Sequence, residues 1–292
     1  MSERQKVLVR AKVPPTVRQR RLGAELRRLR EHAGLSATRA GELFGAPQSR
    51  ISNIEAGNYA VSADRVRALA RLYECSDDAL VQALAAMTGG RTRGWWDEYR
   101  ELLPAALVEV AEFEHEATAL RVAVLVAMPG LLQCAEHVRA AYSQNVPPLR
   151  PFEIEHCTAF RIRRQGVLHR EIPLPYTAII HEAALRMGIG GADVVRAQLR
   201  HLMDMGEHEN VTIQVVPFGQ ADFPASGGQP ITYACGPVPQ LDTVLLDTDH
   251  GLEILHAEDQ LARYREVLDR MRRCALDPAE SRNFIHKIAK SV

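Results

Sequence analysis

Apolar residues recur at helical spacing through the first part of the chain, between runs of basic and short polar residues. This spacing is typical of amphipathic helices that bury one face. Serines and glycines stand at the boundaries of these segments, where they favour helix caps. The predicted helices cover residues 16–32, 36–44, 47–56, 62–72 and 76–87. We therefore predict a mainly α bundle of five helices over residues 16–88.

The second and third of these helices form a compact pair. Ser36 is suited to cap the helix over 36–44, and Gly45 can take the left-handed conformation at the bend. Pro47 suits the opening turn of the helix over 47–56. Ile51 and Ile54 share one face of that second helix, while its other faces carry short polar side chains. Such a helix is typical of one that enters the major groove of DNA.

From Trp95 onward, helical segments alternate with short runs rich in β-branched residues. The pattern predicts an α+β domain over residues 95–292 with a small, largely antiparallel sheet. The paired Trp95 and Trp96 are interpreted as anchors of a core or of a domain interface. Strands are predicted over residues 120–128, 176–180, 211–217, 231–235, 243–246 and 252–255, and helices over 105–118, 131–142, 152–169, 193–206, 258–275 and 278–289, with a further helix opening at Trp95.

The charge of the chain is unevenly distributed. The formal net charge is zero, which at first argues against nucleic acid as a partner. Residues 1–93, however, hold 17 Lys and Arg against 9 Asp and Glu, whereas the remainder holds 19 against 27. This asymmetry is expected when only the first part meets phosphates. We expect residues 1–15 to form a flexible basic arm and the Gly- and Arg-rich residues 89–94 to form a linker.

Four segments of the first part carry a resemblance to a known family. They are Arg-Leu-Gly-Ala-Glu-Leu-Arg-Arg-Leu-Arg (21–30), Ala-Gly-Leu-Ser (33–36), Ile-Ser-Asn-Ile-Glu-Ala-Gly (51–57) and Val-Arg-Ala-Leu-Ala-Arg-Leu-Tyr (66–73). Together they resemble the Cro/CI-type helix-turn-helix domain, also called the XRE family. The resemblance implies a lambda-repressor-like fold and binding to double-stranded DNA.

The resemblance also implies which residues touch DNA. The family's base-reading residues lie early in the recognition helix, where Gln and Asn can bond the adenine edge bidentately. The basic residues of the first helix are expected to add phosphate contacts through their charge. The predicted contacts are Gln48, Ser49 and Asn53 to bases, and Arg18, Arg28, Arg50 and Asn58 to the DNA backbone.

The helix before the recognition helix departs from the family pattern. Ala37 stands where the family usually has a Gln or Thr that reaches the DNA backbone, and Ala40 replaces a core Leu. Gly41, a poor helix former, follows. We expect this supporting helix to be thinner and less stiff than usual.

Six segments of the second part carry another resemblance. They are Gly-Trp-Trp-Asp-Glu-Tyr (94–99), Pro-Gly-Leu-Leu-Gln (129–133), His-Glu-Ala-Ala-Leu-Arg (181–186), Val-Arg-Ala-Gln-Leu-Arg-His-Leu (195–202), Asn-Val-Thr-Ile-Gln-Val-Val-Pro-Phe (210–218) and Pro-Ala-Glu-Ser-Arg (278–282). They resemble the actinobacterial antitoxin-like regulator family, whose members fuse an XRE domain to this C-terminal domain. Membership implies a transcriptional regulator that commonly works with a small, separately encoded partner protein.

Little in the sequence points to catalysis or to a metal. His181 and Glu182 begin a motif like HExxH, but Leu185 replaces the second histidine, and the segment is interpreted as a strand end. The five cysteines form no CxxC pair, which fits buried thiols in a reducing cytoplasm. No signal peptide or membrane-spanning run is predicted. We expect a cytoplasmic, nucleoid-associated protein that is not an enzyme and uses no cofactor.

These observations predict a sequence-specific DNA-binding transcriptional regulator of the XRE type. One recognition helix covers few base pairs, so we expect a homodimer on a palindromic operator with half-sites about one DNA turn apart. The second domain is expected to supply dimerisation, partner binding or both. Two alternatives stay open: a ligand-controlled repressor whose C-terminal domain binds a small molecule, and an antitoxin-like protein whose main function is to bind its partner.

Overall fold

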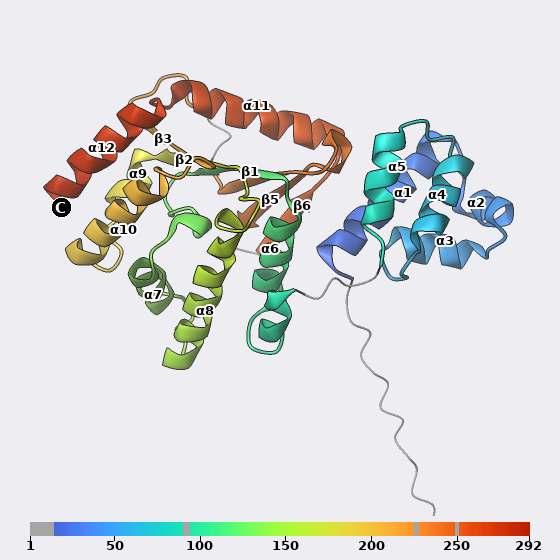
Figure 1. Ribbon diagram of the computed structural model, residues 1–292, viewed down its shortest axis with the longest axis horizontal. Coiled ribbons are helices and arrows are strands. Elements are labelled where there is room, and N and C mark those ends of the chain that lie inside the picture. Colours follow the sequence, from blue (N-terminus) through green and yellow to red (C-terminus); the bar gives the residue numbers. More distant parts are fainter. Residues whose placement is uncertain (1–14, 90–93, 225–227, 249–250) are drawn as a thin grey trace, which may run out of the picture. The chain divides into compact units, whose positions relative to one another are not determined.

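The computed structural model describes residues 15–89, 94–224, 228–248 and 251–292. The chain folds as two compact units, Met1–Thr92 and Arg93–Val292 (Figure 1). Most of the predicted arm and of the predicted linker lies outside the described residues. No helix in the described part of the chain is long and apolar enough to cross a membrane.

The first unit is helical throughout its regular structure. Ser36 and Ser62 cap their helices as predicted, each accepting a hydrogen bond from the backbone N–H three residues later. Two predicted boundaries were wrong by one residue. The last helix is capped by Asp77 rather than Ser76, and Pro47 occupies the N-cap position instead of the first turn. The helices are α1 (Val17–His32), α2 (Ala37–Phe44), α3 (Gln48–Glu55), α4 (Ala63–Leu72) and α5 (Asp78–Ala86).

The second unit is built on a mixed sheet of six strands. Its strands are β1 (Ala119–Val124), β2 (Tyr176–His181), β3 (Val211–Val216), β4 (Ile231–Cys235), β5 (Thr243–Thr248) and β6 (Gly251–Leu255), in the spatial order β3-β2-β1-β4-β5-β6. The β1–β2 and β2–β3 pairs are parallel, and the other three pairs are antiparallel. The sheet is therefore mixed, and the prediction of a largely antiparallel sheet was wrong for the β1–β2 and β2–β3 pairs. Helical crossovers connect β1 to β2 and β2 to β3, which is how parallel neighbours are joined.

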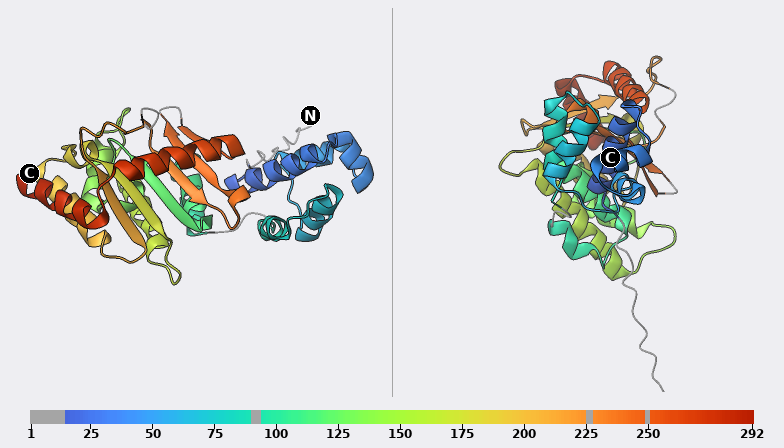
Figure 2. Two further views of the ribbon diagram at one scale, coloured as in Figure 1. Left: turned by 90° about the horizontal axis from the view of Figure 1, so that it is seen from above. Right: turned by 90° about the vertical axis from the view of Figure 1, so that its right-hand side faces the viewer.

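Helices cover both faces of this sheet (Figures 1 and 2). One face is covered by α11, whose Leu261, Leu268 and Met271 pack into the core of the sheet. The helices α6, α7, α8 and α10 lie on the other face, and α12 packs against α10 and β3. Their bounds are α6 (Ala105–Glu116), α7 (Ala135–Ser143), α8 (Pro151–Arg164), α9 (Glu182–Arg186), α10 (Ala192–Met205), α11 (Glu258–Cys274) and α12 (Pro278–Ser291).

Side chains of the central strands alternate between these two faces, as the pleat of a strand requires. In β4, Ile231 and Tyr233 join the core under α11, whereas Thr232 faces the α6–α8 side. In β5, Leu246 and Leu245 divide in the same way. The side chains on the second face of the sheet therefore pack toward the helices α6, α7 and α8, apart from the core under α11.

The tryptophan pair lies in a core between the segment before α6 and the helix α8. Trp96 is fully buried, and Trp95 packs on Phe160 at 5.3 Å between ring centroids. These contacts agree with the interpretation of the pair as a core anchor. The helix predicted to open at Trp95 is a short 3-10 helix, Trp95–Tyr99, and a turn and Pro104 separate it from α6.

Candidate nucleic-acid interface

The helix pair α2–α3 is joined by a tight turn. Gly45 takes the left-handed conformation, with φ 71° and ψ 35°, and so ends α2 as predicted. A Cβ on Gly41 would lie 2.6 Å from the carbonyl oxygen of Ala46, so only glycine lets the turn pack this closely. Ala40 is completely buried in the same region. The small residues Ala40 and Gly41 therefore let α2 pack closely against the turn. A thinner helix was predicted from the sequence, but this close packing was not.

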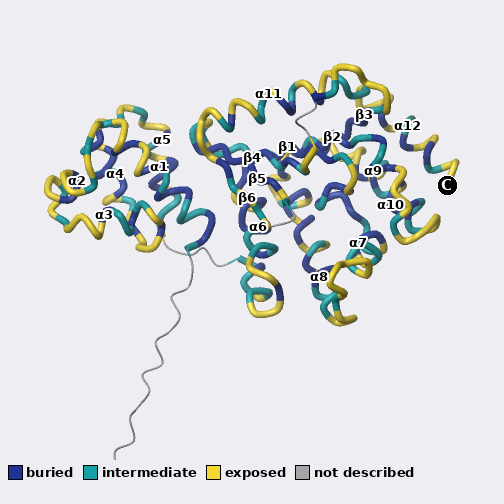
Figure 3. Tube along the Cα trace, turned by 180° about the vertical axis from the view of Figure 1, so that it is seen from behind, coloured by how far each residue is buried: buried dark blue, intermediate teal, exposed yellow. Residues whose placement is uncertain are grey.

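The helix α3 buries one face and exposes the other. Ile51 and Ile54 are almost completely buried, as predicted. Gln48, Ser49 and Arg50 are exposed at the start of the helix, and exposed segments run along α2 and α3 in Figure 3. Three of the predicted contact residues are therefore brought together on one accessible surface.

The predicted base-reading amides are hydrogen-bonded within their own helix or beside it. Gln48 Nε2 donates to Ser52 Oγ at 2.8 Å, and Asn53 Nδ2 donates to the Ser49 carbonyl oxygen at 2.7 Å. Asn58 Nδ2 donates weakly to Asn53 Oδ1 at 3.4 Å, which brings those two predicted contacts together. Each side-chain amide has two N–H donors and an acceptor oxygen, so Gln48 and Asn53 can keep these bonds and still offer a donor and an acceptor to a base edge.

The arginines predicted to touch the DNA backbone have different surroundings. Arg50 is exposed and makes no side-chain hydrogen bond or ion pair with residues in the described ranges. Arg28 is 52% exposed and is paired with Glu25, a buried carboxylate that Arg21 also contacts at 3.2 Å. Arg18 donates to the carbonyl oxygens of Ala86 and Met87 at the C-terminal end of α5. In this structure Arg18 thus ties α1 to α5, while Arg50 is the most available of these three cations.

A buried ion pair that the sequence reasoning missed connects α1 to α3. Arg30 Nε and Nη2 donate to the two carboxylate oxygens of Glu55 at 2.6 and 3.0 Å, and each side chain is only 8% exposed. Arg30 Nη1 also donates to the Leu35 carbonyl oxygen at 2.6 Å, just before α2. The hydrogen bond to Glu55 raises the pKa of Arg30. One guanidinium therefore connects the end of α3 to the segment that begins α2.

Two glycines allow α1 to lie close to the end of α3. A Cβ on Gly23 would stand 2.3 Å from the Glu55 carbonyl oxygen, so a side chain cannot fit there. Gly57 has φ 73°, and a Cβ there would stand 2.9 Å from the backbone of Gln19. A glycine in the middle of a helix is otherwise unfavourable. Gly23 was thus the signal in the sequence that could have indicated this contact.

The described residues offer no metal centre. No group of three or more His, Cys, Asp and Glu side chains in the described ranges is placed to hold a metal ion. His181 ends β2, but the segment after it is not simply a strand end as interpreted, because α9 begins at Glu182. There the Glu182 carboxylate accepts a hydrogen bond from the Phe218 backbone N–H at 2.9 Å and pairs with Arg186.

The helix pair α2–α3, the left-handed turn at Gly45 and the outward polar face of α3 define a helix-turn-helix protein with a second, α+β unit. A family model described as a helix-turn-helix domain matches residues 21–84, which suggests a DNA-binding regulator. A second model, described as a domain of unknown function (DUF5753), matches residues 107–287. That match spans more than half of the chain, so the protein belongs to the DUF5753 family. No curated protein and no solved structure matches the chain.

Proposed function

We propose that this protein is a sequence-specific DNA-binding transcriptional regulator of the XRE type, with α3 as its recognition helix. The observation that carries the proposal is the exposed polar start of α3, held at its other end by the buried Arg30–Glu55 pair. A recognition helix must hold its base-contacting side chains in fixed positions, which requires that the helix itself be packed rigidly in its domain. On this proposal the protein works in the cytoplasm, at the nucleoid.

The contacts follow from the chemistry of the exposed groups. Gln48, Ser49 and Asn53 would read base edges in the major groove, since amides and hydroxyls match the donors and acceptors there. Arg50 and Asn58 would contact phosphates beside the groove, and Arg28 would add charge from α1. Arg18 is the weakest of the predicted backbone contacts because its guanidinium already donates to two carbonyl groups.

We further propose that the protein acts as a homodimer. One copy of α3 reads only a few base pairs, and two copies on a palindromic site multiply the discrimination. The prediction is an operator with two half-sites about one turn of DNA apart, roughly 10 base pairs centre to centre. Selection of bound fragments from the genomic DNA of the source organism, followed by sequencing, would return this spacing.

The resemblance of the second unit to antitoxin-like regulators supports a further part of the proposal, namely that the protein binds a small partner protein encoded beside its gene. Co-expression of this protein with that partner would give a complex of defined stoichiometry that survives gel filtration. If the neighbouring protein elutes separately at micromolar concentrations, the partner element of the proposal is wrong and the DNA-binding element is untouched.

The base-reading role is tested by Gln48→Ala on the selected operator. Loss of a bidentate contact should cost about 1–3 kcal/mol on the operator and almost nothing on random DNA. Gln82→Ala is a matched control, because Gln82 is an exposed glutamine on α5, outside the helix pair. An equal loss on both DNAs for Gln48→Ala, or an equal effect of Gln82→Ala, would refute the assignment of α3.

A further inference from the structure

A cavity of about 580 Å³ lies in the second unit, between the sheet and the helices α6, α7 and α8. Its walls are largely apolar and include Val122, Val124, Leu245 and Phe113. The segment before and within the Pro-Gly-Leu-Leu-Gln motif closes one side. This volume lies within the range of about 300–1,000 Å³ that small-molecule sites occupy.

One of the two arginines that line the cavity is neutralised by the protein. Arg164 forms a buried two-point ion pair with Glu114, at 2.9 and 2.5 Å, and both side chains are 6% exposed. Because the two charges cancel and are both hydrogen-bonded, this pair adds no net charge to the wall. It leaves a polar but neutral end to the cavity.

The other arginine is not neutralised in this way. Arg161 Nη1 donates to Gln133 Oε1 at 3.0 Å and Nη2 donates to the Tyr142 hydroxyl at 2.8 Å, and both partners are uncharged. Its buried Nε–H has no hydrogen-bond partner among the described residues. A half-buried cation that lacks a carboxylate is costly, and its attraction for an anion is strengthened by the low dielectric around it.

The positive charge of Arg161 acts on its buried neighbours. Burial lowers the pKa of the His137 imidazole, and the charge of Arg161 lowers it further. His137 Nδ1 is also buried without a hydrogen-bond partner in the described part of the chain. The lowered pKa favours the neutral imidazole, so His137 adds no second cation beside Arg161.

A second polar group in the cavity lacks a protein partner. Tyr176, at the start of β2, lines the cavity, and its hydroxyl makes no hydrogen bond to any residue in the described ranges. Burial, and next the charge of Glu114, raise the pKa of Tyr176, so that its hydroxyl keeps its proton. The hydroxyl is thus a donor available to a molecule inside the cavity.

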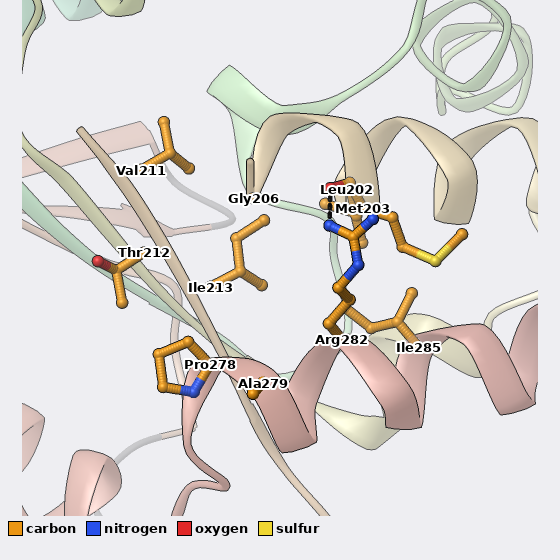
Figure 4. Close-up of a pocket in the computed structure, with 10 residues that line it drawn as sticks. All are labelled: Leu202, Met203, Gly206, Val211, Thr212, Ile213, Pro278, Ala279, Arg282 and Ile285. Atoms are coloured by element: carbon orange, nitrogen blue, oxygen red, sulfur yellow. Dashed lines mark hydrogen bonds between the residues drawn. The ribbon is translucent and has the colours of Figure 1, made fainter. Parts of the chain in front are cut away.

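A smaller cavity of about 220 Å³, between α10, α12 and the edge strand β3, provides a comparison (Figure 4). Its cation, Arg282, donates to the Met203 carbonyl oxygen at 3.1 Å and to the Glu207 carboxylate at 2.6 Å. Charge and donors are satisfied there by the protein itself. This second cavity therefore lacks the uncompensated charge that distinguishes the cavity at Arg161.

We propose that the larger cavity binds a small organic acid with an apolar body and a single carboxylate. The carboxylate supplies the negative charge that Arg161 lacks, and the apolar body covers the aliphatic and aromatic walls. A phosphate ester fits less well, because its second charge and three oxygens need more donors than the cavity offers. Asp247 stands at the exposed rim, where water screens its repulsion of the acid.

The test is calorimetric titration of the full-length protein with hexanoate, decanoate and phenylbutanoate, with decanol as the uncharged analogue of decanoate. At least one acid should bind saturably, and decanoate should bind about ten-fold or more tightly than decanol, as expected for a charged hydrogen bond. Arg161→Gln should reduce this ratio of affinities to about one while decanol binding persists, which shows that the variant is folded. Ala141→Phe, which places a larger side chain on the cavity wall, should weaken binding of both compounds.

A matched control is Arg163→Gln, on the same helix. Arg163 is 40% exposed and pairs with Glu98 at the surface, outside the cavity. The Arg163→Gln variant should bind decanoate with the same affinity as the natural protein. The proposal is overturned if none of the acids binds, if decanol binds as tightly as decanoate, or if Arg161→Gln and Arg163→Gln have the same effect. None of these outcomes depends on whether the first unit binds DNA.

Discussion

Replacement of Glu55 by alanine tests whether the buried ion pair holds the recognition helix in place. Arg30 and Glu55 share two hydrogen bonds and are each 8% exposed. Removal of the carboxylate leaves the Arg30 guanidinium charged in a nearly dry environment, with the Leu35 carbonyl and the half-exposed Glu31 carboxylate, 3.5 Å away, as its remaining partners. The change therefore adds the cost of a poorly compensated buried charge to the loss of the pair itself.

The size of the effect follows from the burial. Breaking a buried, hydrogen-bonded ion pair by removing one partner costs about 3–5 kcal/mol. The stability of a small domain is about 5–15 kcal/mol in total, so the first unit should lose a large fraction of its stability. The matched control is Glu42→Ala, since Glu42 pairs with Arg39 on the surface and both side chains are 58% exposed. That pair is screened by water and should contribute little.

Hydrogen exchange measured by mass spectrometry on the full-length chain resolves the two units. Peptides from α1 and α3 should exchange about 100-fold faster or more in Glu55→Ala than in Glu42→Ala, because exchange from the core reports the stability of its unit. Both tryptophans lie in the second unit, so an unchanged Trp fluorescence spectrum shows that this unit is intact. Equal exchange in α3 for the two variants would refute the reasoning.

Three further predictions concern the same unit. Gly23→Ala should lower the melting temperature of the first unit because its Cβ would meet the Glu55 carbonyl oxygen, although alanine normally stabilises a helix by about 1 kcal/mol over glycine. An unchanged or raised melting temperature would contradict this close contact. Burial, and next the charge of Glu55, raise the pKa of Tyr73 to about 12 from 10.0, so the unit should lose stability as the pH rises above 10. Denaturation curves across this range should show the loss, and Tyr73→Phe should remove it. Arg50→Ala should weaken binding to all DNA sequences and reduce the slope of affinity against salt by about one, whereas an unchanged slope would place Arg50 away from phosphates.

Local signals in the sequence were sufficient for most of the helix-turn-helix unit. Ser36, Gly45 and Ile51 act through neighbouring backbone or through helical periodicity, so their roles can be predicted from a short window. The pair of Arg30 and Glu55 depends on two helices crossing 25 residues apart in the chain, which no local pattern specifies. The predicted contacts of α3 with DNA remain predictions.

The direction of the strands in the second unit was harder to predict than their positions. The strand run from Leu120 was expected to extend to Met128 but ends at Val124, and all six predicted strands have an observed counterpart. Composition does not distinguish parallel from antiparallel pairing when a strand such as β2 is buried on both faces. The informative signal was the length of the connections, since helices lie between β1 and β2 and between β2 and β3.

The motif Pro-Gly-Leu-Leu-Gln, which carried part of the family resemblance, has a physical role at the cavity. A Cβ on Gly130 would lie 3.2 Å from Arg161 Nη1 and 3.4 Å from Arg164 Nη2, so glycine lets both guanidinium groups pack against the loop. Gln133 then holds Arg161 through its side-chain oxygen, and its amide nitrogen donates to the Met128 carbonyl oxygen at 3.0 Å. A neutral amide thus fixes the position of the arginine without cancelling its charge. A carboxylate at residue 133 would keep the contact with Arg161 and neutralise its charge, but it could not donate to the Met128 carbonyl oxygen. Gln133→Glu should therefore lower the stability of the unit and abolish the preference for decanoate over decanol, and retained decanol binding shows that the variant is folded.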